Sequence, residues 1–236
     1  MVPNVGDKIA CLYEQLQDQE SKNVLIDILR FLSDSSKKYL VRSNYPQYRH
    51  PHIEFSYPFK MIDGGACRGE VFGQFSDLMK PENQFLLLEP EIENLSYIEI
   101  EKSKSEANIQ ILPLGLWSSK KSLFFSSPQQ SGAHYNCMVS DQGDIEIKVI
   151  DLDQLCIEQN FEPNFIKMDI EGAEVEALKS SVNTIRALSP KLAICLYHDL
   201  DDLWNIPKFI NDINPNYKMY MGHHSDSWFE TVLYCK

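Results

Sequence analysis

The organisation of this chain follows from one segment, Phe59-Lys60-Met61-Ile62-Asp63-Gly64-Gly65-Ala66-Cys67-Arg68-Gly69. Residues 59–63 have the apolar character of a short strand, which runs into a turn with three glycines in six positions. Glycine has no Cβ and adopts positive φ at little steric cost, so a glycine-rich turn lets a ligand come close to the backbone. The segment therefore predicts a strand and a ligand-binding turn.

A second apolar run, Phe85-Leu86-Leu87-Leu88, ends in Glu89-Pro90, and Glu89 lies 26 residues after Asp63. An acid at the end of the next strand can accept hydrogen bonds from the two ribose hydroxyls of an adenosine. The glycine turn alone is explained equally well as a purely structural turn. The acid at this spacing favours a nucleoside cofactor, held at the carboxyl edge of a parallel sheet.

The spacing within the turn bears on the kind of nucleoside. The order Asp-Gly-Gly-x-x-x-Gly differs from the G-x-G-x-x-G of dinucleotide-binding folds. Asp63 would repel a pyrophosphate, but its carboxylate can accept a hydrogen bond from an ammonium group. S-adenosylmethionine has an amino-acid end and no phosphate, so the turn favours this cofactor over NAD.

Composition sets the outer bounds. The chain has 236 residues, enough for one domain with a substantial core. Its 22 basic and 34 acidic residues give a net charge of −12, which makes nucleic acid and anionic membranes poor partners. The six cysteines are scattered without a C-x-x-C pair, which favours reduced thiols. Because no membrane span or signal peptide is evident, we expect a cytoplasmic protein.

Strands and helices alternate from Phe59 onward. Strands are expected at 59–63, 85–89, 109–114, 165–169, 192–196, 217–221 and 229–234, and helices near 70–79, 91–104, 151–155, 171–179 and 201–213. Residues 117–150, with β-like runs at 122–126 and 145–150, predict a hairpin-like insertion. The order predicts an α/β fold, a Rossmann-like three-layer sandwich. Its seven-stranded sheet would be mostly parallel with an antiparallel terminal strand.

Residues 1–58 are expected to form an N-terminal cap, and residues 59–236 a separate domain. Residues 7–33 have the apolar spacing of helices, with Ser21 as a candidate cap of the second one. Residues 37–58 are irregular and rich in tyrosine, histidine and arginine. They fit either a wrapped connector with aromatic anchors or a lid that forms one wall of an acceptor site.

Ligands of such sheets bind beyond the carboxyl ends of the strands. The ionisable residues at the expected strand ends are Asp63, Glu89, Asp169 and His198, followed later by His223 and His224. Asp169 and His198 are candidates for a functional role, because packing of a strand end requires no charge. Glu174, in the first turn of the next expected helix, is interpreted as a stabilising or solvated acid.

These residues carry a family resemblance over roughly residues 59–236. The segments concerned are Asp63-Gly64-Gly65-Ala66 with Gly69, Leu88-Glu89-Pro90, Ile166-Lys167-Met168-Asp169-Ile170-Glu171-Gly172-Ala173-Glu174, Tyr197-His198 with Asp202-Leu203-Trp204, and Glu230-Thr231-Val232-Leu233-Tyr234. Together they resemble the FkbM-type methyltransferases. The chain departs from the family at Cys67, where the family often has asparagine or an aromatic residue; we expect a packing role for this cysteine rather than a nucleophilic one.

The resemblance implies an S-adenosylmethionine-dependent O-methyltransferase of the class I fold, with residues 59–236 as the methyltransferase domain. Asp63, Gly64, Gly65 and Gly69 would then hold the amino-acid end of the cofactor, and Glu89 its ribose. Residues around Gly115 to Trp117, including Leu116, would border the adenine. Ala66, Pro90 and Asp169 complete the expected cofactor-binding set.

Transfer to a hydroxyl requires removal of its proton, and two routes fit. In the first, His198 or Asp169 acts as general base. In the second, a divalent metal bound by Asp169 and His198 lowers the pKa of the hydroxyl. The metal-free route is favoured because Mg²⁺ prefers an all-oxygen ligand set, which a histidine interrupts.

The expected acceptor is a small molecule, and tyrosines and histidines within 39–57 suggest a sugar. Arg42, Arg49 and Arg68 suggest instead a phosphate, as in a nucleotide sugar; other secondary metabolites remain open. A homo-oligomer is possible. Two other classes are a catalytically inactive cofactor-binding module that serves a partner protein, and an NAD-dependent dehydrogenase, which the spacing of the turn disfavours.

Overall fold

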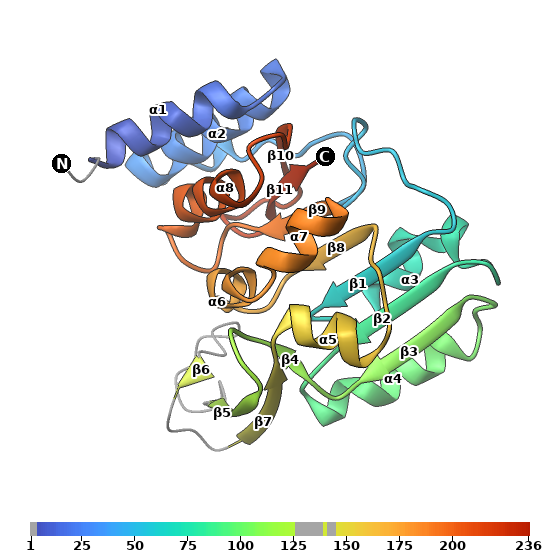
Figure 1. Ribbon diagram of the computed structural model, residues 1–236. Coiled ribbons are helices and arrows are strands. Elements are labelled where there is room, and N and C mark those ends of the chain that lie inside the picture. Colours follow the sequence, from blue (N-terminus) through green and yellow to red (C-terminus); the bar gives the residue numbers. More distant parts are fainter. Residues whose placement is uncertain (1–3, 126–138, 141–144) are drawn as a thin grey trace. The chain divides into compact units, whose positions relative to one another are not determined.

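The computed structural model describes residues 4–125, 139–140 and 145–236 (Figure 1). Their internal contacts divide the chain into two compact units. Unit 1 comprises Met1–Glu54 and Lys191–Lys236, and unit 2 comprises Phe55–Pro190. The assignment of residues 1–58 as a cap and 59–236 as a methyltransferase domain stays a prediction.

Unit 2 is built on four parallel strands in the order β8 (Phe165–Met168), β1 (Lys60–Gly64), β2 (Gln84–Leu88) and β3 (Asn108–Leu112). The apolar residues of β1, β2 and β8 are almost fully buried, as expected of parallel strands that are covered on both faces. In the register of β1 and β8, Asp63 pairs with Lys167 and Gly64 with Met168. The carboxyl ends of the two strands therefore lie side by side.

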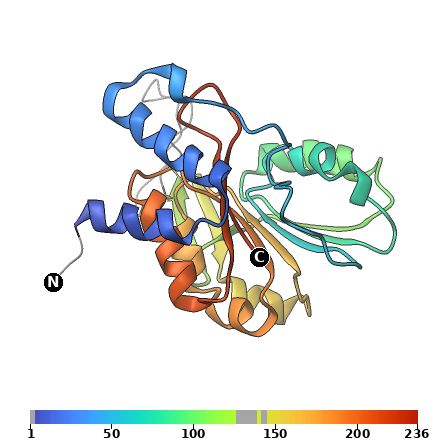
Figure 2. The ribbon, with the colours of Figure 1, turned by 90° about the horizontal axis from the view of Figure 1, so that it is seen from above.

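Helices α3 (Glu70–Gln74) and α4 (Ile92–Lys102) lie on the same side of β1, β2 and β3 (Figure 2). The helix expected over 70–79 is interrupted after Gln74 and continues as the 3₁₀ turn Ser76–Leu78. The helix expected from 171 begins only at Glu174, as α6 (Glu174–Lys179).

Helix α5 (Leu152–Glu158) packs against α7 (Val182–Leu188), which the apolar spacing did not predict. The Asp153 carboxylate holds the start of α7, because its two oxygens accept from Asn183 N at 3.0 Å and Thr184 N at 2.8 Å. Asp153 lies 30 positions before Asn183 in the sequence, so the residues around the start of α7 contain no N-cap pattern from which the helix could be predicted.

The expected insertion is a second small sheet. Its strands are β4 (Gly115–Leu116), β5 (Lys121–Phe125), β6 (Val139–Ser140) and β7 (Ile145–Ile150), in the order β4-β7-β5-β6. β5 and β7 are antiparallel, which confirms the hairpin-like pairing. Ser126, the last residue of the first expected run, lies outside the described residues.

Unit 1 contains α1 (Val5–Gln15), α2 (Gln19–Asp34), the 3₁₀ turn Lys37–Tyr39, α8 (Asp202–Ile213) and three strands. The strands are β9 (Lys191–Cys195), β10 (Met219–His223) and β11 (Thr231–Cys235), in the order β10-β11-β9. β11 is antiparallel to both of its neighbours in this unit.

The expectation that Ser21 caps the second helix is wrong. Asp18 is the N-cap, and its carboxylate accepts from Ser21 N at 2.7 Å. The Ser21 hydroxyl instead accepts from Met221 N at 2.9 Å. Serine is a common cap, but here its hydroxyl attaches α2 to strand β10, a tertiary contact that the local pattern does not contain.

The predicted fold class is confirmed: an α/β, Rossmann-like methyltransferase fold with seven main strands, parallel except for the antiparallel terminal strand β11. Within the described residues, no helix has both the length and the apolar character needed to cross a membrane. The five cysteines in this part of the chain are thiols and form no disulfide with one another.

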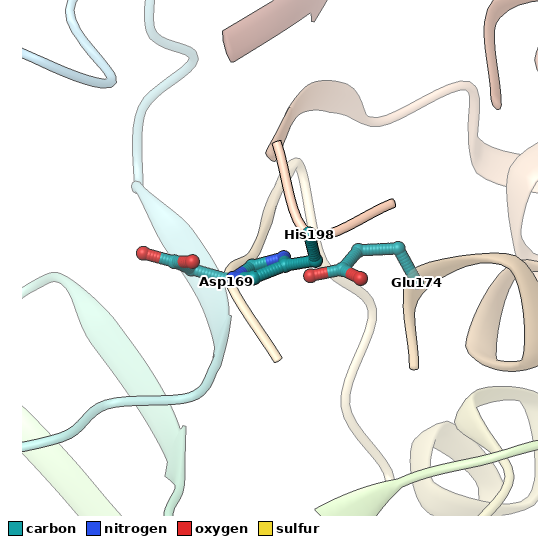
Figure 3. A group of neighbouring side chains, drawn as sticks. All are labelled: Asp169, Glu174 and His198. Atoms are coloured by element: carbon teal, nitrogen blue, oxygen red, sulfur yellow. The ribbon is translucent and has the colours of Figure 1, made fainter. Parts of the chain in front are cut away.

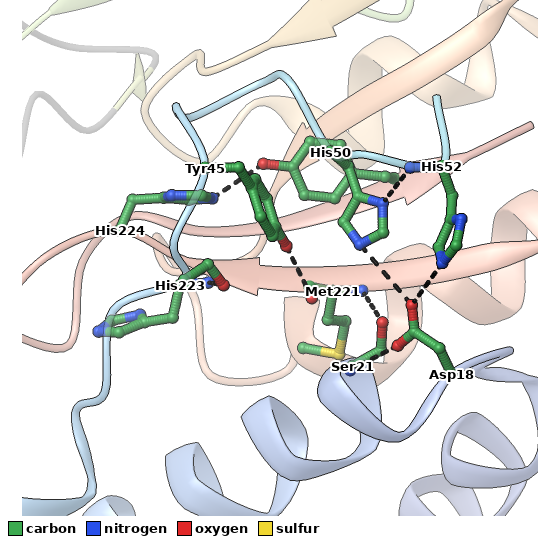
Figure 4. Close-up of polar contacts among 10 residues, drawn as sticks. Asp18, Ser21, Tyr45, His50, His52, Met221, His223 and His224 are labelled. Carbon is green, nitrogen blue, oxygen red and sulfur yellow. Dashed lines mark hydrogen bonds and ion pairs between the residues drawn. The ribbon is translucent and has the colours of Figure 1, made fainter. Parts of the chain in front are cut away.

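The segment 37–58 places several aromatic side chains in unit 1 (Figure 4). Tyr48 and His50 are 5% and 3% exposed, and Tyr48 N donates to the Tyr234 hydroxyl at 3.1 Å. The His50 ring lies 4.8 Å from the ring of Tyr220 and 4.9 Å from that of Tyr45. These contacts are those of a connector with aromatic anchors, so Tyr48 and His50 serve packing in unit 1.

His50 predicts a pH dependence of stability. Burial lowers its pKa from 6.5 to about 4, against the opposing effect of Asp18, so folding favours the neutral ring. The unfolded chain binds the proton at higher pH, and the free energy of unfolding therefore falls as pH decreases from 6.5 to about 4. In this window, His50→Gln is expected to remove about 1.4 kcal/mol of pH dependence per pH unit.

Denaturant unfolding across this pH range checks the effect. His52→Gln is the control, because the His52 side chain is 53% exposed. If the slopes of wild type and His50→Gln coincide, buried His50 does not contribute to the acid sensitivity.

Candidate functional site

The glycine turn after β1 has a conformation that requires glycine at two positions. Gly65 has φ +75° and Gly69 has φ +92°. The amides of Gly65 and Ala66 both donate to the Leu88 carbonyl, each at 3.0 Å. A Cβ on Gly65 would lie 1.8 Å from the carbonyl oxygen of Asp169. The turn therefore passes directly against the chain that follows β8.

Glu89 follows β2 and is in contact with the turn. Its side chain is buried, and Oε2 accepts from Cys67 N at 2.7 Å while Oε1 accepts from Glu91 N at 2.8 Å. Burial raises the pKa of Glu89, although the hydrogen bonds from the Glu91 and Cys67 amides act in the opposite direction. Each carboxylate oxygen has two lone pairs, so Glu89 retains the capacity to accept from two ligand hydroxyls.

Lys167 is the site residue that the sequence reasoning missed. Its Nζ lies 2.8 Å from Asp63 Oδ1 and donates to the carbonyl of Gly65 at 2.6 Å. Asp63 and Lys167 are 1% and 6% exposed. Burial raises the pKa of Asp63, against the lowering effect of Lys167. The available signal was a lysine within the otherwise apolar strand Phe165–Met168, opposite Asp63 in the parallel register.

The residues expected near the adenine lie beside the turn. Leu116 is buried, and its Cδ1 lies 2.8 Å from the place where a Cβ on Gly64 would be. Gly115 faces Pro90, whose Cγ lies 3.7 Å from the corresponding position on Gly115. Unit 2 thus brings Gly64, Pro90, Gly115 and Leu116 together.

Asp169 and Glu174 come from the segment that follows β8 (Figure 3). Asp169 is half-buried, and its amide donates to the Gly64 carbonyl at 3.1 Å. Glu174 is fully buried, and its Oε1 accepts from Ile170 N at 2.8 Å. Of the two interpretations of Glu174, the stabilising acid agrees with this bond and the solvated acid is wrong.

The expected histidines belong to unit 1. His198 comes three residues after the end of β9, and its role stays a prediction. His223 Nδ1 lies 2.9 Å from Thr231 Oγ1, and His224 Nε2 lies 2.9 Å from the Tyr234 hydroxyl. Burial lowers the pKa of His224 to about 4, so this ring is neutral at physiological pH.

The packing role expected for Cys67 is wrong, because its side chain is exposed. It also has φ +47°, in the left-handed region of the turn. Although the residue is exposed, partial burial of the sulfur within the turn and the carboxylates of Glu70 and Glu89 raise the pKa of the thiol to about 11. The thiol therefore stays protonated at neutral pH, which agrees with the expectation that it is not a nucleophile.

The donor and acceptor set of unit 2 fits an adenosine cofactor without phosphates. Glu89 offers anionic acceptors for hydroxyls, and Asp169 adds a carboxylate beside the turn, whereas Asp63 is paired with Lys167. A sulfonium nucleoside is cationic and tolerates these acids, whereas a pyrophosphate does not. The arrangement of turn, acid and parallel strand ends is that of class I methyltransferases.

Comparison with known proteins agrees with this class. The family model described as methyltransferase FkbM domain matches residues 63–224. The solved methyltransferase FkbM from Methylobacillus flagellatus KT is 26% identical, with a TM-score of 0.79. The match covers 98% of this chain and 58% of that protein, so the chain spans a little over half of its length. None of the proteins with curated descriptions matches the sequence.

The chain also resembles the fibrillarin of Aeropyrum pernix, solved with natively bound S-adenosyl-L-methionine. That likeness has 8% identity and a TM-score of 0.49, and it covers 80% of this chain and 70% of that one.

The chain belongs to the FkbM methyltransferase family, because the family model covers well over half of its length. The expected family is thereby confirmed, and with it S-adenosyl-L-methionine as the cofactor.

Proposed function

We propose that this protein transfers the methyl group of S-adenosylmethionine to a hydroxyl oxygen of a small molecule, with a sugar or nucleotide sugar as the first candidate. Unit 2 would bind the cofactor with the turn Gly64–Gly69 at its amino-acid end, Glu89 at its ribose, and Gly115 and Leu116 beside its adenine. The observation that carries the proposal is the 2.7 Å hydrogen bond from Cys67 N to Glu89. It joins the glycine turn directly to the ribose-binding candidate.

When bound, the cofactor would supply an electrophilic methyl carbon on a sulfonium, with a thioether as the leaving group for in-line attack by the acceptor oxygen. The protein's part is to align the acceptor oxygen and to take its proton. Either Asp169, which directly follows β8, or His198, which follows β9, is the proposed general base, on the grounds of their place after strand ends. A positioned base contributes about 10²–10⁴-fold to the rate.

One cation at the turn, Arg68, supports a phosphate-bearing acceptor. Arg68 is exposed within the turn, and its guanidinium lies 4.9 Å from the centre of the Tyr97 ring. A guanidinium held on an aromatic face still presents its N–H groups to a phosphate. Arg42 is less available, because it pairs with Asp226 at 2.7 Å.

Labelled S-adenosylmethionine with a panel of glycans, nucleotide sugars and polyketides tests the reaction directly. With an acceptor in hand, His198→Gln is expected to lower kcat by about 10²–10⁴-fold while the dissociation constant of S-adenosylhomocysteine stays unchanged. A normal kcat would remove His198 as the base. If EDTA abolishes turnover and an added divalent metal restores it, the metal-free route is wrong.

A further inference from the structure

The ion pair of Lys167 and Asp63 lies directly beneath the glycine turn. Both side chains are more than nine-tenths buried, and each belongs to the penultimate residue of one of two paired parallel strands. The Lys167 ammonium faces three acceptors of one segment: Asp63 Oδ1 at 2.8 Å and the carbonyls of Gly65 and Gly64 at 2.6 Å and 3.3 Å. The two carbonyls accept hydrogen bonds from this ammonium, and the Asp63 carboxylate balances its charge as an ion pair.

Lys167 and the Leu88 carbonyl together hold two peptide groups of the turn, each at both its carbonyl and its N–H. The Gly65–Ala66 peptide has its carbonyl on Lys167 and its N–H on the Leu88 carbonyl. The preceding Gly64–Gly65 peptide has its carbonyl on Lys167 and Asp169 N, and its N–H also on Leu88. Glycine peptides rotate easily, so a turn that must present its backbone to a ligand requires such two-sided restraint.

Asp63 is poorly placed to receive the cofactor itself. Its side chain is 1% exposed, and one of its oxygens already holds Lys167. The ammonium of a ligand at the same carboxylate would lie near the Lys167 ammonium, and two like charges in a buried place repel strongly. The Asp63 carboxylate, which the sequence pattern assigned to the amino group of the cofactor, is therefore paired with Lys167 instead.

We propose that Lys167 and Asp63 are positioning residues: Lys167 fixes the carbonyls of the glycine turn in their binding orientation, and Asp63 holds Lys167 rather than the amino group of the cofactor. The inference rests on the proposed cofactor site and reassigns one of its expected ligands. The two roles considered for Asp63 are holding Lys167 and contacting the cofactor directly. They predict different losses of cofactor affinity for substitutions of Asp63 relative to substitutions of Lys167.

The experiment measures the dissociation constant of S-adenosylhomocysteine by calorimetry and the Tm of each variant. Lys167→Met is expected to weaken binding about tenfold or more, because the turn loses a charged donor. Asp63→Asn is expected to weaken it clearly less, because the lysine stays in reach of the carbonyls. The double variant should recover Tm relative to Lys167→Met, since no buried carboxylate is left without its cation. Its affinity should remain as weak as that of Lys167→Met.

Asn83→Ala is the control for loss of stability alone. Asn83 is fully buried directly before β2, where its side chain accepts from Phe59 N at 2.8 Å and donates to the Leu78 carbonyl at 2.9 Å. This variant should lower Tm without changing the affinity for S-adenosylhomocysteine.

Two results would overturn the assignment. If Asp63→Asn weakens binding as much as Lys167→Met, Asp63 contacts the ligand directly. If affinity returns together with Tm in the double variant, Lys167 is only a structural residue. If Lys167→Met fails to fold, the affinity of the double variant is compared with that of Asp63→Asn instead, because these two variants differ only in the presence of Lys167. Absence of binding by the wild type would instead reject the proposed function, and this inference with it.

Discussion

Gly65→Ala is expected to weaken the binding of S-adenosylhomocysteine on the order of 100-fold. The new methyl group would lie 1.8 Å from the carbonyl oxygen of Asp169 and 2.9 Å from its carbonyl carbon, and both are backbone atoms. The φ of +75° adds strain for any residue with a Cβ. The turn must therefore move away from the end of β8 by about 1 Å, a misplacement that typically costs on the order of 100-fold in binding or rate.

Gly73→Ala provides a matched control in the helix that follows. A Cβ on Gly73 meets nothing within 4 Å, and the residue lies in α3. Alanine is favoured over glycine in a helix by about 0.5–1 kcal/mol, so this variant should keep its affinity and gain slightly in stability. Equal affinity of both variants for S-adenosylhomocysteine, by calorimetry, would show that the close approach at Gly65 does not shape the site.

The strand order was predictable because its signals are local. Continuous apolar runs such as Phe85–Leu88 and Leu192–Leu196 mark strands covered on both faces, and helical spacing separates them. The boundaries shifted by one or two residues at most strands: 59–63 became Lys60–Gly64, and 85–89 became Gln84–Leu88. The contact between the glycine turn and Glu89 was predictable as well, because parallel strands bring their carboxyl ends to one edge.

The features that the sequence did not reveal depend on partners distant along the chain. Lys167 is one charged residue in an apolar strand, and its role depends on the register that places Asp63 opposite. Likewise, Asp153 of α5 caps the start of α7, and the Ser21 hydroxyl accepts a hydrogen bond from β10 instead of capping α2. Local propensity describes what a segment favours, whereas these hydrogen bonds are decided by which segments meet.

Glu89→Ala is expected to weaken binding of S-adenosylhomocysteine by about 100-fold or more, because two hydrogen bonds to a charged acceptor contribute about 1.5–3 kcal/mol each. The substitution also leaves the amides of Cys67 and Glu91 without their acceptor, so the turn loosens at the same time. Since burial raises the pKa of Glu89, affinity of the wild type should begin to fall on acidification at a pH above the ordinary value of 4.5 for a glutamate.

A ligand lacking the ribose 2′-hydroxyl separates direct recognition from loosening of the turn. Wild-type protein should bind 2′-deoxy-S-adenosylhomocysteine about tenfold or more weaker than the parent ligand, because the buried carboxylate loses a hydroxyl partner. Glu89→Ala should bind both ligands equally weakly. The control is Glu93→Ala, an exposed acid in the first turn of α4, which should retain affinity and discrimination. Discrimination that persists in Glu89→Ala would assign ribose recognition to another residue and leave Glu89 only its hydrogen bonds to the turn.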